Sequence, residues 1–242
     1  GPPGGYGAPP PAGGGYGGPP PGAPGGYGGG ANWDVGAAVN YGWTKFQANA
    51  GQMILAALAI FVGIVVIEAI VFFGVLSSSD GGFLGLIVAL LCYILLFIYA
   101  QVVGAGLIRE SLGVAGGRPF TTAGVFRFDN IGPVIVTSLL VGVGTFVGTL
   151  LCVLPGIVFG FMTMYALFFV VHRNLEPVDA IKASIDLVKN NLGPTIIWYL
   201  VASLICMAGA ILCGVGLLAA IPIVLLGSAY TFKTLLGEPV AP

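Results

Sequence analysis

Charged side chains are scarce in this chain. They make up 7% of its 242 residues, whereas about a quarter of the residues in a soluble globular domain are charged. The mean hydropathy is +1.02, and 57% of the residues are hydrophobic. These values exclude an ordinary soluble domain and favour an integral membrane protein. The net charge of −1 argues against a nucleic-acid partner, because contacts to phosphates need a basic patch.

Residue types that carry chemistry are also few. The one histidine, His172, precedes Arg173 at the end of an apolar run. We interpret it as a polar residue at a membrane face, because a metal ligand or catalytic base needs partners that the sequence does not offer. The sequence contains no Cys-x-x-Cys pair and no glycine-rich loop followed by Lys-Ser or Lys-Thr. We therefore expect no enzymatic activity, no metal and no cofactor.

The four cysteines lie in apolar runs and are expected to act as small hydrophobic residues; they are Cys92, Cys152, Cys206 and Cys213. Cys152 and Cys213 fall near the same predicted membrane face, so a disulfide between them remains an alternative.

Residues 1–31 carry no charge and repeat Gly-Gly-Tyr-Gly around Tyr6, Tyr16 and Tyr27 between proline runs. They have neither the basic start nor the apolar core of a signal peptide. Such a composition predicts a disordered tail, because little apolar surface is available to offset the entropy of ordering. The tail is either a flexible tether or an arm that binds protein partners through tyrosine and polyproline segments.

Six apolar runs follow the tail, and about 20 residues suffice to cross a bilayer. The runs form three hairpins and cover residues 52–76, 83–108, 131–153, 157–171, 194–213 and 216–233. An amphipathic segment precedes each hairpin, at 32–49, 121–128 and 177–192. The predicted fold class is an all-α polytopic membrane protein, with six transmembrane helices in three hairpins that each follow an interfacial helix.

The three hairpins are expected to be repeats of one unit, starting at about residues 32, 119 and 176 of a membrane domain that covers 32–238 and precedes a C-terminal tail, 239–242. Each unit enters its hairpin through Asn-x-Gly; the corner residues are Asn49 and Gly51, Asn130 and Gly132, and Asn191 and Gly193. Asparagine tolerates left-handed backbone geometry and glycine adopts it at little cost, so this pair suits a sharp turn into the bilayer.

All eight Lys and Arg residues fall on one side of this topology. Under the positive-inside rule, both termini are cytoplasmic.

Glu68 is the one acidic residue well inside a predicted span, where an ionised side chain is costly and often functional. A rise of about 1.5 Å per residue places Tyr93, Thr145 and Thr163 at a similar depth. Three alternatives remain open: a protonated Glu68 that fixes helix register through a hydrogen bond, a proton or cation site in a transport path, and a contact with lipid headgroups or a partner.

Several short motifs resemble the membrane domain associated with glycerophosphoryl diester phosphodiesterases and its stand-alone bacterial relatives. They are Leu154-Pro155-Gly156-Ile157, His172-Arg173-Asn174, Asp179-Ala180-Ile181-Lys182-Ala183-Ser184 and Asn191-Leu192-Gly193. The resemblance covers residues 32–238 and implies a bacterial inner-membrane location. The soluble phosphodiesterase barrel is absent, so its chemistry is not implied.

Two functions are compatible with these features. The first is a non-enzymatic membrane scaffold or assembly factor, with membrane lipids around it and protein partners bound to its tail. The second is a small transporter or lipid-handling protein that uses Glu68 as its coupling group.

Overall fold

The computed structural model describes residues 33–77, 83–127, 129, 131–211 and 215–242. The predictions made for residues 1–31, Asn130 and Cys213 therefore lie outside the described residues. Within the described ranges every regular element is an α-helix. In chain order the helices are α1 (Val35–Ser77), α2 (Phe83–Ala115), α3 (Thr122–Val125), α4 (Ile131–Leu151), α5 (Val153–Met162), α6 (Ala166–Arg173), α7 (Pro177–Asn190), α8 (Leu192–Ile211) and α9 (Leu217–Leu235).

Six helical segments in this part of the chain are long and apolar enough to cross a membrane. They are α1, α2, α4, α5 together with α6, α8 and α9. This confirms the predicted all-α fold class with six spans. The protein is a multi-pass membrane protein.

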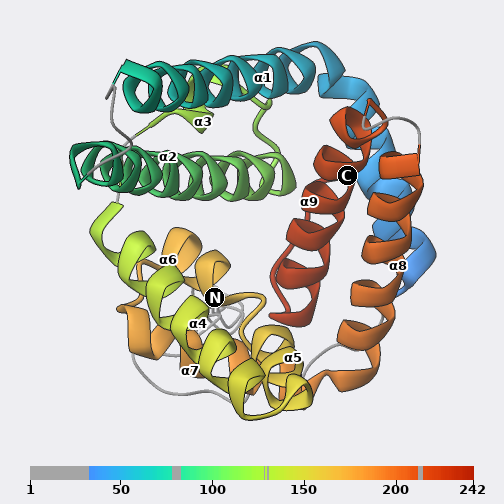
Figure 1. The fold of residues 1–242 in the computed structure, drawn as a ribbon. Coiled ribbons are helices and arrows are strands. Elements are labelled where there is room, and N and C mark those ends of the chain that lie inside the picture. The colour runs from blue at the N-terminus through green and yellow to red at the C-terminus, as the bar shows by residue number, and fades with distance from the viewer. Residues whose placement is uncertain (1–32, 78–82, 128, 130, 212–214) are drawn as a thin grey trace, which may run out of the picture.

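The first helix is longer than the sequence pattern indicates. Two helices are expected over 32–49 and 52–76, but α1 runs without a break from Val35 to Ser77. Figure 1 shows that α1 instead turns along its length, with its first part beside α9 and its second part beside α2. A glycine makes the first contact close, because a Cβ at Gly42 would collide with the carbonyl oxygen of Ile223 on α9.

The corner residues that the structure describes do not have the left-handed backbone that the sequence analysis expects. Gly51, Gly132 and Gly193 lie inside helices with open space around them, and Asn191 has a φ of −134° between α7 and α8. Positive φ occurs elsewhere in the described residues. That part of the prediction is therefore wrong.

The asparagine side chains act at the corners instead. Nδ2 of Asn49 donates a hydrogen bond to the carbonyl of Lys45, four residues earlier, at 2.9 Å. Nδ2 of Asn191 donates to the carbonyl of Leu187, again four residues earlier and at 2.9 Å. Two of the three predicted corners thus share one side-chain contact, which is local support for their equivalence.

Small residues bring α4 and α5 together. A Cβ at Gly148 would lie 3.0 Å from the Cα of Gly156, so the two glycines face each other across the hairpin. The turn lies at Cys152, which has an extended backbone between the two helices. It therefore comes earlier than the expected break at Pro155-Gly156, because Pro155 occupies the first turn of α5, where proline is tolerated.

The fourth span is interrupted between Met162 and Ala166, which the sequence analysis does not predict. A hydroxyl from α7 fills the interruption: Ser184 Oγ donates to the carbonyl of Met162 at 2.9 Å and accepts from the amide of Tyr165 at 3.1 Å. Ser184 is fully buried. It replaces backbone bonds that the broken helix cannot make.

The predicted helix over 177–192 is present as α7 (Pro177–Asn190), but its buried face is rotated from the expected one. The expected stripe is Val178, Ile181, Ile185, Val188 and Leu192; Val188 is fully buried and Ile181 and Ile185 are half-buried, whereas Val178 and Leu192 are 53% and 42% exposed. The buried residues are Ala180, Ala183, Ser184, Leu187 and Val188. Small side chains allow α7 to approach α6 closely, which explains why this face is chosen.

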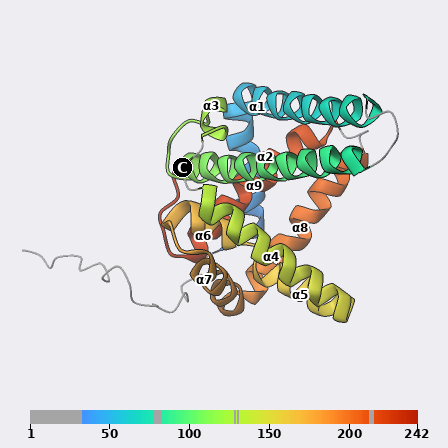
Figure 2. The ribbon, with the colours of Figure 1, turned by 60° about the vertical axis from the view of Figure 1, so that its left-hand side comes forward.

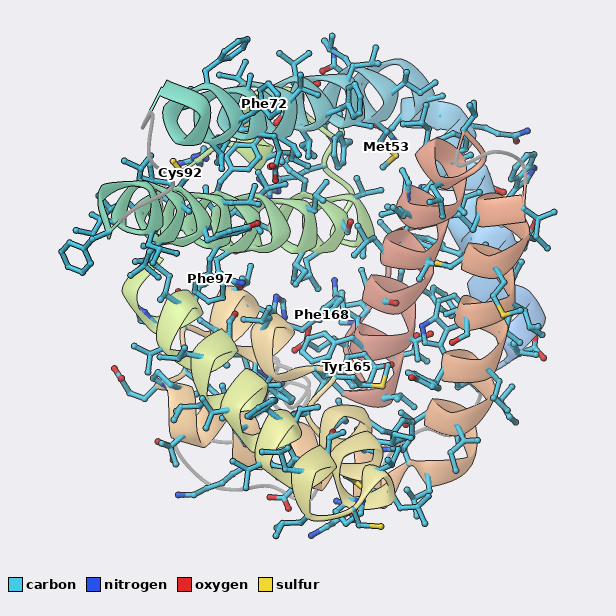
Figure 3. The ribbon with its side chains drawn as sticks, viewed as in Figure 1. Met53, Phe72, Cys92, Phe97, Tyr165 and Phe168 are labelled. Carbon is cyan, nitrogen blue, oxygen red and sulfur yellow. The ribbon has the colours of Figure 1, made fainter. Side chains whose placement is uncertain are left out.

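Aromatic side chains of α6, of the residue before it and of α9 form the centre of the larger core. Tyr165 and Phe168 point toward α9 (Figure 3) and lie with ring centroids 5.6 and 5.3 Å from that of Phe232. Trp198 of α8 is fully buried, and its Nε1 donates to Ser228 of α9 at 3.0 Å. The last helix is therefore the element on which the other spans converge.

Different elements lie at the two ends of the bundle. Figure 2 shows α3, α7 and the C-terminus on one side of the molecule and the adjoining ends of α1 and α2 on the other. Residues 239–242, expected as a tail, pack against the first side. The amide of Ala241 donates to the carbonyl of Ala115 at 3.0 Å, and Lys45 donates to the carbonyl of Pro242.

Candidate functional site

The polar residues predicted inside the spans do not form one site in the structure. Glu68 on α1 and Tyr93 on α2 lie at similar levels of an antiparallel pair, since Tyr99 packs on Gly63. Both side chains are exposed, Tyr93 by 61%. No hydrogen bond joins them among the described residues.

The two threonines belong to the second hairpin. Thr145 lies beside Gly160, whose Cβ would be 3.7 Å from the threonine hydroxyl. Thr163 is buried, and its hydroxyl donates to the carbonyl of Phe159 at 2.9 Å, within its own helical turn. Both threonines therefore have local structural roles in α4 and α5.

A cavity of about 450 Å³ lies between α1, α2 and α9. Its lining is apolar apart from Ser111, and Glu68 is not part of it. Met53 lies at this cavity, between the turn of α1 and α9 (Figure 3). The cavity supplies apolar surface and no group that could couple transport to a proton.

Cationic side chains line a second cavity, of about 230 Å³. Arg109 comes from α2, Arg118 from the loop after α2, His172 from α6 and Lys233 from α9. We call this cavity the cationic pocket, and the end of the bundle that contains it the cationic end. Lys233 is only 8% exposed, and its ammonium donates to the carbonyl of Ala115 at 3.3 Å.

A glycine turn at the end of α2 places Arg118 over the helix. Gly117 has a φ of +89°, its amide donates to the carbonyl of Val114, and the amide of Arg118 donates to that of Gly113, both at 2.9 Å. This is the Schellman arrangement, which returns the chain over the last turn of the helix. Gly113 leaves room for the guanidinium, because a Cβ there would lie 2.6 Å from Nη2 of Arg118.

The end of α9 repeats this arrangement. Gly237 has a φ of +72°, its amide donates to the carbonyl of Thr234, and the amide of Glu238 donates to that of Lys233. The turn brings Glu238 back to α6, where its carboxylate contacts His172 Nε2 at 2.7 Å and accepts from Arg173 at 3.0 Å. Burial alone would raise the pKa of Glu238, but the hydrogen bonds and charges of His172 and Arg173 lower it to about 2.

The charges around the pocket do not cancel. Arg109, Arg118 and Lys233 line the pocket, and Glu238 and Arg173 beside it form an ion pair and cancel, as do Arg127 and Asp129 next to Arg109. The sum is +3 with His172 neutral. Glu110 is also buried, but its carboxylate accepts the amide and hydroxyl of Thr121 at 2.8 and 2.9 Å, on the α3 side of α2. Helix C-termini of α2, α6 and α9 contribute about −0.5 each, roughly half of the cationic excess.

Sequence reasoning used Arg109, Arg118 and Lys233 only to orient the spans, and it treated His172 as a polar residue at a membrane face. It missed the pocket because the four residues are far apart in the chain and meet only when α2, α6 and α9 converge. One local signal was available: Gly116-Gly117 and Gly237 each follow a long apolar helix, and a charged residue comes next in both cases. That pattern is typical of a helix end whose following side chain is aimed back at the helix.

The described helices and their cationic end define a polytopic all-α membrane protein. The chain is similar to the uncharacterized protein Rv2560 of Mycobacterium tuberculosis (strain H37Rv), with 34% identity over 230 residues that cover 87% of this chain and 71% of that protein. It has the same identity and coverage with the uncharacterized proteins Mb2590 of Mycobacterium bovis and MT2637 of Mycobacterium tuberculosis (strain CDC 1551). The chain belongs to the family that these mycobacterial proteins form. No protein-family model and no solved structure matches it.

Proposed function

We propose that this protein is a non-enzymatic scaffold of the bacterial inner membrane, with both termini in the cytoplasm and the cationic end facing it. The hairpins would anchor the scaffold in lipid, and the cationic end would hold partner proteins near the membrane. We also propose that the chain is a stand-alone relative of the membrane domain of glycerophosphoryl diester phosphodiesterases, on the strength of the short motifs given above.

The observation that carries the proposal is a layer of hydrogen bonds at the cationic end. Asn49 Oδ1 accepts the amide of Phe120 at 3.0 Å and so joins α1 to the loop before α3. The indole of Trp33 donates to the Thr231 hydroxyl at 3.1 Å, which joins the start of the described chain to α9. With the bond from Ala241 to α2, both ends of the folded chain are fixed in one rigid layer.

A rigid layer suits a scaffold because it presents a fixed surface to partners. The outer surface of α7 is such a surface: its charged stripe is exposed and consists of Asp179, Lys182, Asp186 and Lys189. The proline- and tyrosine-rich residues 1–31 precede the layer in the sequence, and the proposal assigns partner capture to them.

The test compares the full chain with a variant that lacks residues 1–31. Both proteins are purified from their native membrane in mild detergent, and the co-purifying proteins are identified. We expect the deletion to remove most of the specific partners while the temperature of unfolding stays unchanged. A second variant keeps the tail length and replaces Tyr6, Tyr16 and Tyr27 by serine. It should also lose partners if the tyrosines bind them. An unchanged set of partners in the deletion variant would contradict the proposal.

A further inference from the structure

We propose that the cationic pocket binds a phosphate group, presented either by an anionic phospholipid or as free inorganic phosphate. This inference goes beyond the scaffold function and does not depend on it. The pocket is a cavity of about 230 Å³, many times the roughly 30 Å³ that a water molecule occupies in the liquid. It therefore has room for a phosphate group.

Hydrogen-bond donors remain available in the pocket. Among the described residues, the Arg118 guanidinium has no hydrogen-bond partner, although it lines the cavity. The Lys233 ammonium has three donors and uses one of them on the carbonyl of Ala115. Arg109 is partly engaged, since it donates to the carbonyls of Arg127 and Asp129 at 3.3 and 3.1 Å. An incoming anion would find donors on two different elements.

Buried and confined cations favour an anion with several oxygens. Lys233 is held out of water inside the bundle, where its attraction to an anion is weakly screened. The guanidinium of Arg118 presents parallel N–H donors that match two oxygens of a phosphate, whereas an ammonium acts as a point charge. One arginine and one lysine that line the same cavity thus offer the donors that a tetrahedral oxyanion needs.

The position of the pocket is also suited to a lipid phosphate. It lies where the last turns of α2, α6 and α9 come together, at the end of three membrane-spanning segments. Phosphates of a bilayer lie at that level, next to the ends of the apolar helices. A free phosphate would reach the same cations from the aqueous side.

Two substitutions test the charge of Arg118 and the position of its guanidinium separately. Arg118→Gln removes an exposed cation whose side chain makes no hydrogen bond in the described part of the chain. Gly113→Ala keeps every charge but displaces Arg118, because the new Cβ would meet Nη2 at 2.6 Å and Cζ at 3.0 Å. The three nearest atoms it would meet belong to the long, exposed side chain of Arg118, so folding should not suffer.

Each variant has a matched control. Lys182→Gln removes an exposed cation of α7, outside the pocket. Gly104→Ala adds a Cβ to the same helix as Gly113, at a position with nothing within 4 Å. Lys182→Gln removes one positive charge, as Arg118→Gln does, and Gly104→Ala replaces a glycine of α2 by alanine, as Gly113→Ala does. Neither control changes or contacts Arg118.

The experiment uses the full chain in detergent micelles with two probes, phosphatidylglycerol and inorganic phosphate. Retained lipid is counted by native mass spectrometry after detergent exchange, and phosphate binding is measured as a rise in the unfolding temperature relative to chloride at matched ionic strength. We expect Arg118→Gln and Gly113→Ala to weaken binding of the effective probe by about tenfold or more, with both controls like the wild type.

The two probes identify the source of the phosphate. Retention of phosphatidylglycerol without an effect of inorganic phosphate assigns the pocket to a lipid, and the reverse assigns it to free phosphate; both results support the proposal. Binding of neither probe overturns it. It is also overturned if Lys182→Gln weakens binding as much as Arg118→Gln, because attraction to the pocket would then be no stronger than attraction to any surface cation.

Discussion

The hydroxyl of Ser184 on α7 donates to the carbonyl of Met162 at the end of α5, at a distance of 2.9 Å. The same oxygen accepts the amide of Tyr165, so one buried side chain serves both open backbone groups of the interrupted fourth span. A side chain from another helix therefore stabilises the interruption.

Ser184→Ala should therefore destabilise the fold. The substitution leaves a buried carbonyl and a buried amide without their partner, which costs about 1–3 kcal/mol of the free energy of unfolding. Denaturation of the purified protein in detergent measures the loss. Ser203→Ala is the control, because Ser203 bonds only the Tyr199 carbonyl of its own helix, and its effect should stay within about 0.5 kcal/mol. Equal effects of the two substitutions would show that Ser184 does not bridge the interruption.

Two glycines of α2 differ in how much space surrounds them, so alanine at each should change the stability differently. A Cβ at Gly106 would overlap the backbone carbonyl of Val125 on α3, whereas a Cβ at Gly104 meets nothing within 4 Å. We expect Gly106→Ala to cost about 1–3 kcal/mol through overpacking. Gly104→Ala should be neutral or stabilise by up to about 1 kcal/mol, because alanine favours the helix.

The check is the difference in unfolding free energy between the two variants, measured under one set of conditions. Both substitutions add one methyl group to one helix, so their general effect on α2 cancels. If Gly106→Ala is as stable as Gly104→Ala, α3 does not dock on α2 as the structure describes.

The sequence predicted the spans well because their signal is local. Length and hydropathy suffice for a crossing of the membrane, and the six apolar runs match the six candidate spans. Position was also predictable at one corner, since Asn191 lies between α7 and α8, whereas Asn49 lies inside the unbroken α1. Their geometry was not predictable, because each asparagine makes a side-chain hydrogen bond to a carbonyl four residues earlier and has no left-handed backbone.

The candidate site was not predictable for a different reason. Arg118 and Lys233 are ordinary cations at the ends of apolar helices when the sequence is considered alone. They line one cavity only because α2 and α9 converge, and because Gly113 leaves space for the guanidinium. Glu68 attracted attention by its local context, yet the structure places it on an exposed face of α1.

Glu238 makes the stability of the cationic end depend on pH. Its pKa in the folded protein is about 2, below the ordinary value of 4.5. A lowered pKa means that the folded state favours the carboxylate. The stabilisation is therefore fully present above pH 4.5 and is lost as the pH falls from about 4.5 to about 2.

Glu238→Gln tests this dependence. At neutral pH the variant should be less stable than the wild type by about 1 kcal/mol, since the carboxylate is partly exposed and its pairing is screened by solvent. The difference should shrink to zero as the pH approaches about 2. Unfolding at a series of pH values measures it, with Asp186→Asn on the exposed face of α7 as the control. A difference that stays constant down to low pH would refute the role of the carboxylate.

The proposed orientation predicts opposite labelling of two positions. Cys152 is exposed at the turn between α4 and α5, and Lys189 is exposed on α7. Moving a Lys or Arg through the bilayer centre costs about 2.5–3.5 kcal/mol per residue, so the cation-rich side should remain inside. A membrane-impermeant maleimide applied to intact cells should modify a variant that keeps Cys152 alone. It should not modify a Lys189→Cys variant without other cysteines until the cells are permeabilised. A cysteine-free chain gives the background, and labelling of the α7 position in intact cells would reverse the orientation and with it the cytoplasmic assignment of the cationic end.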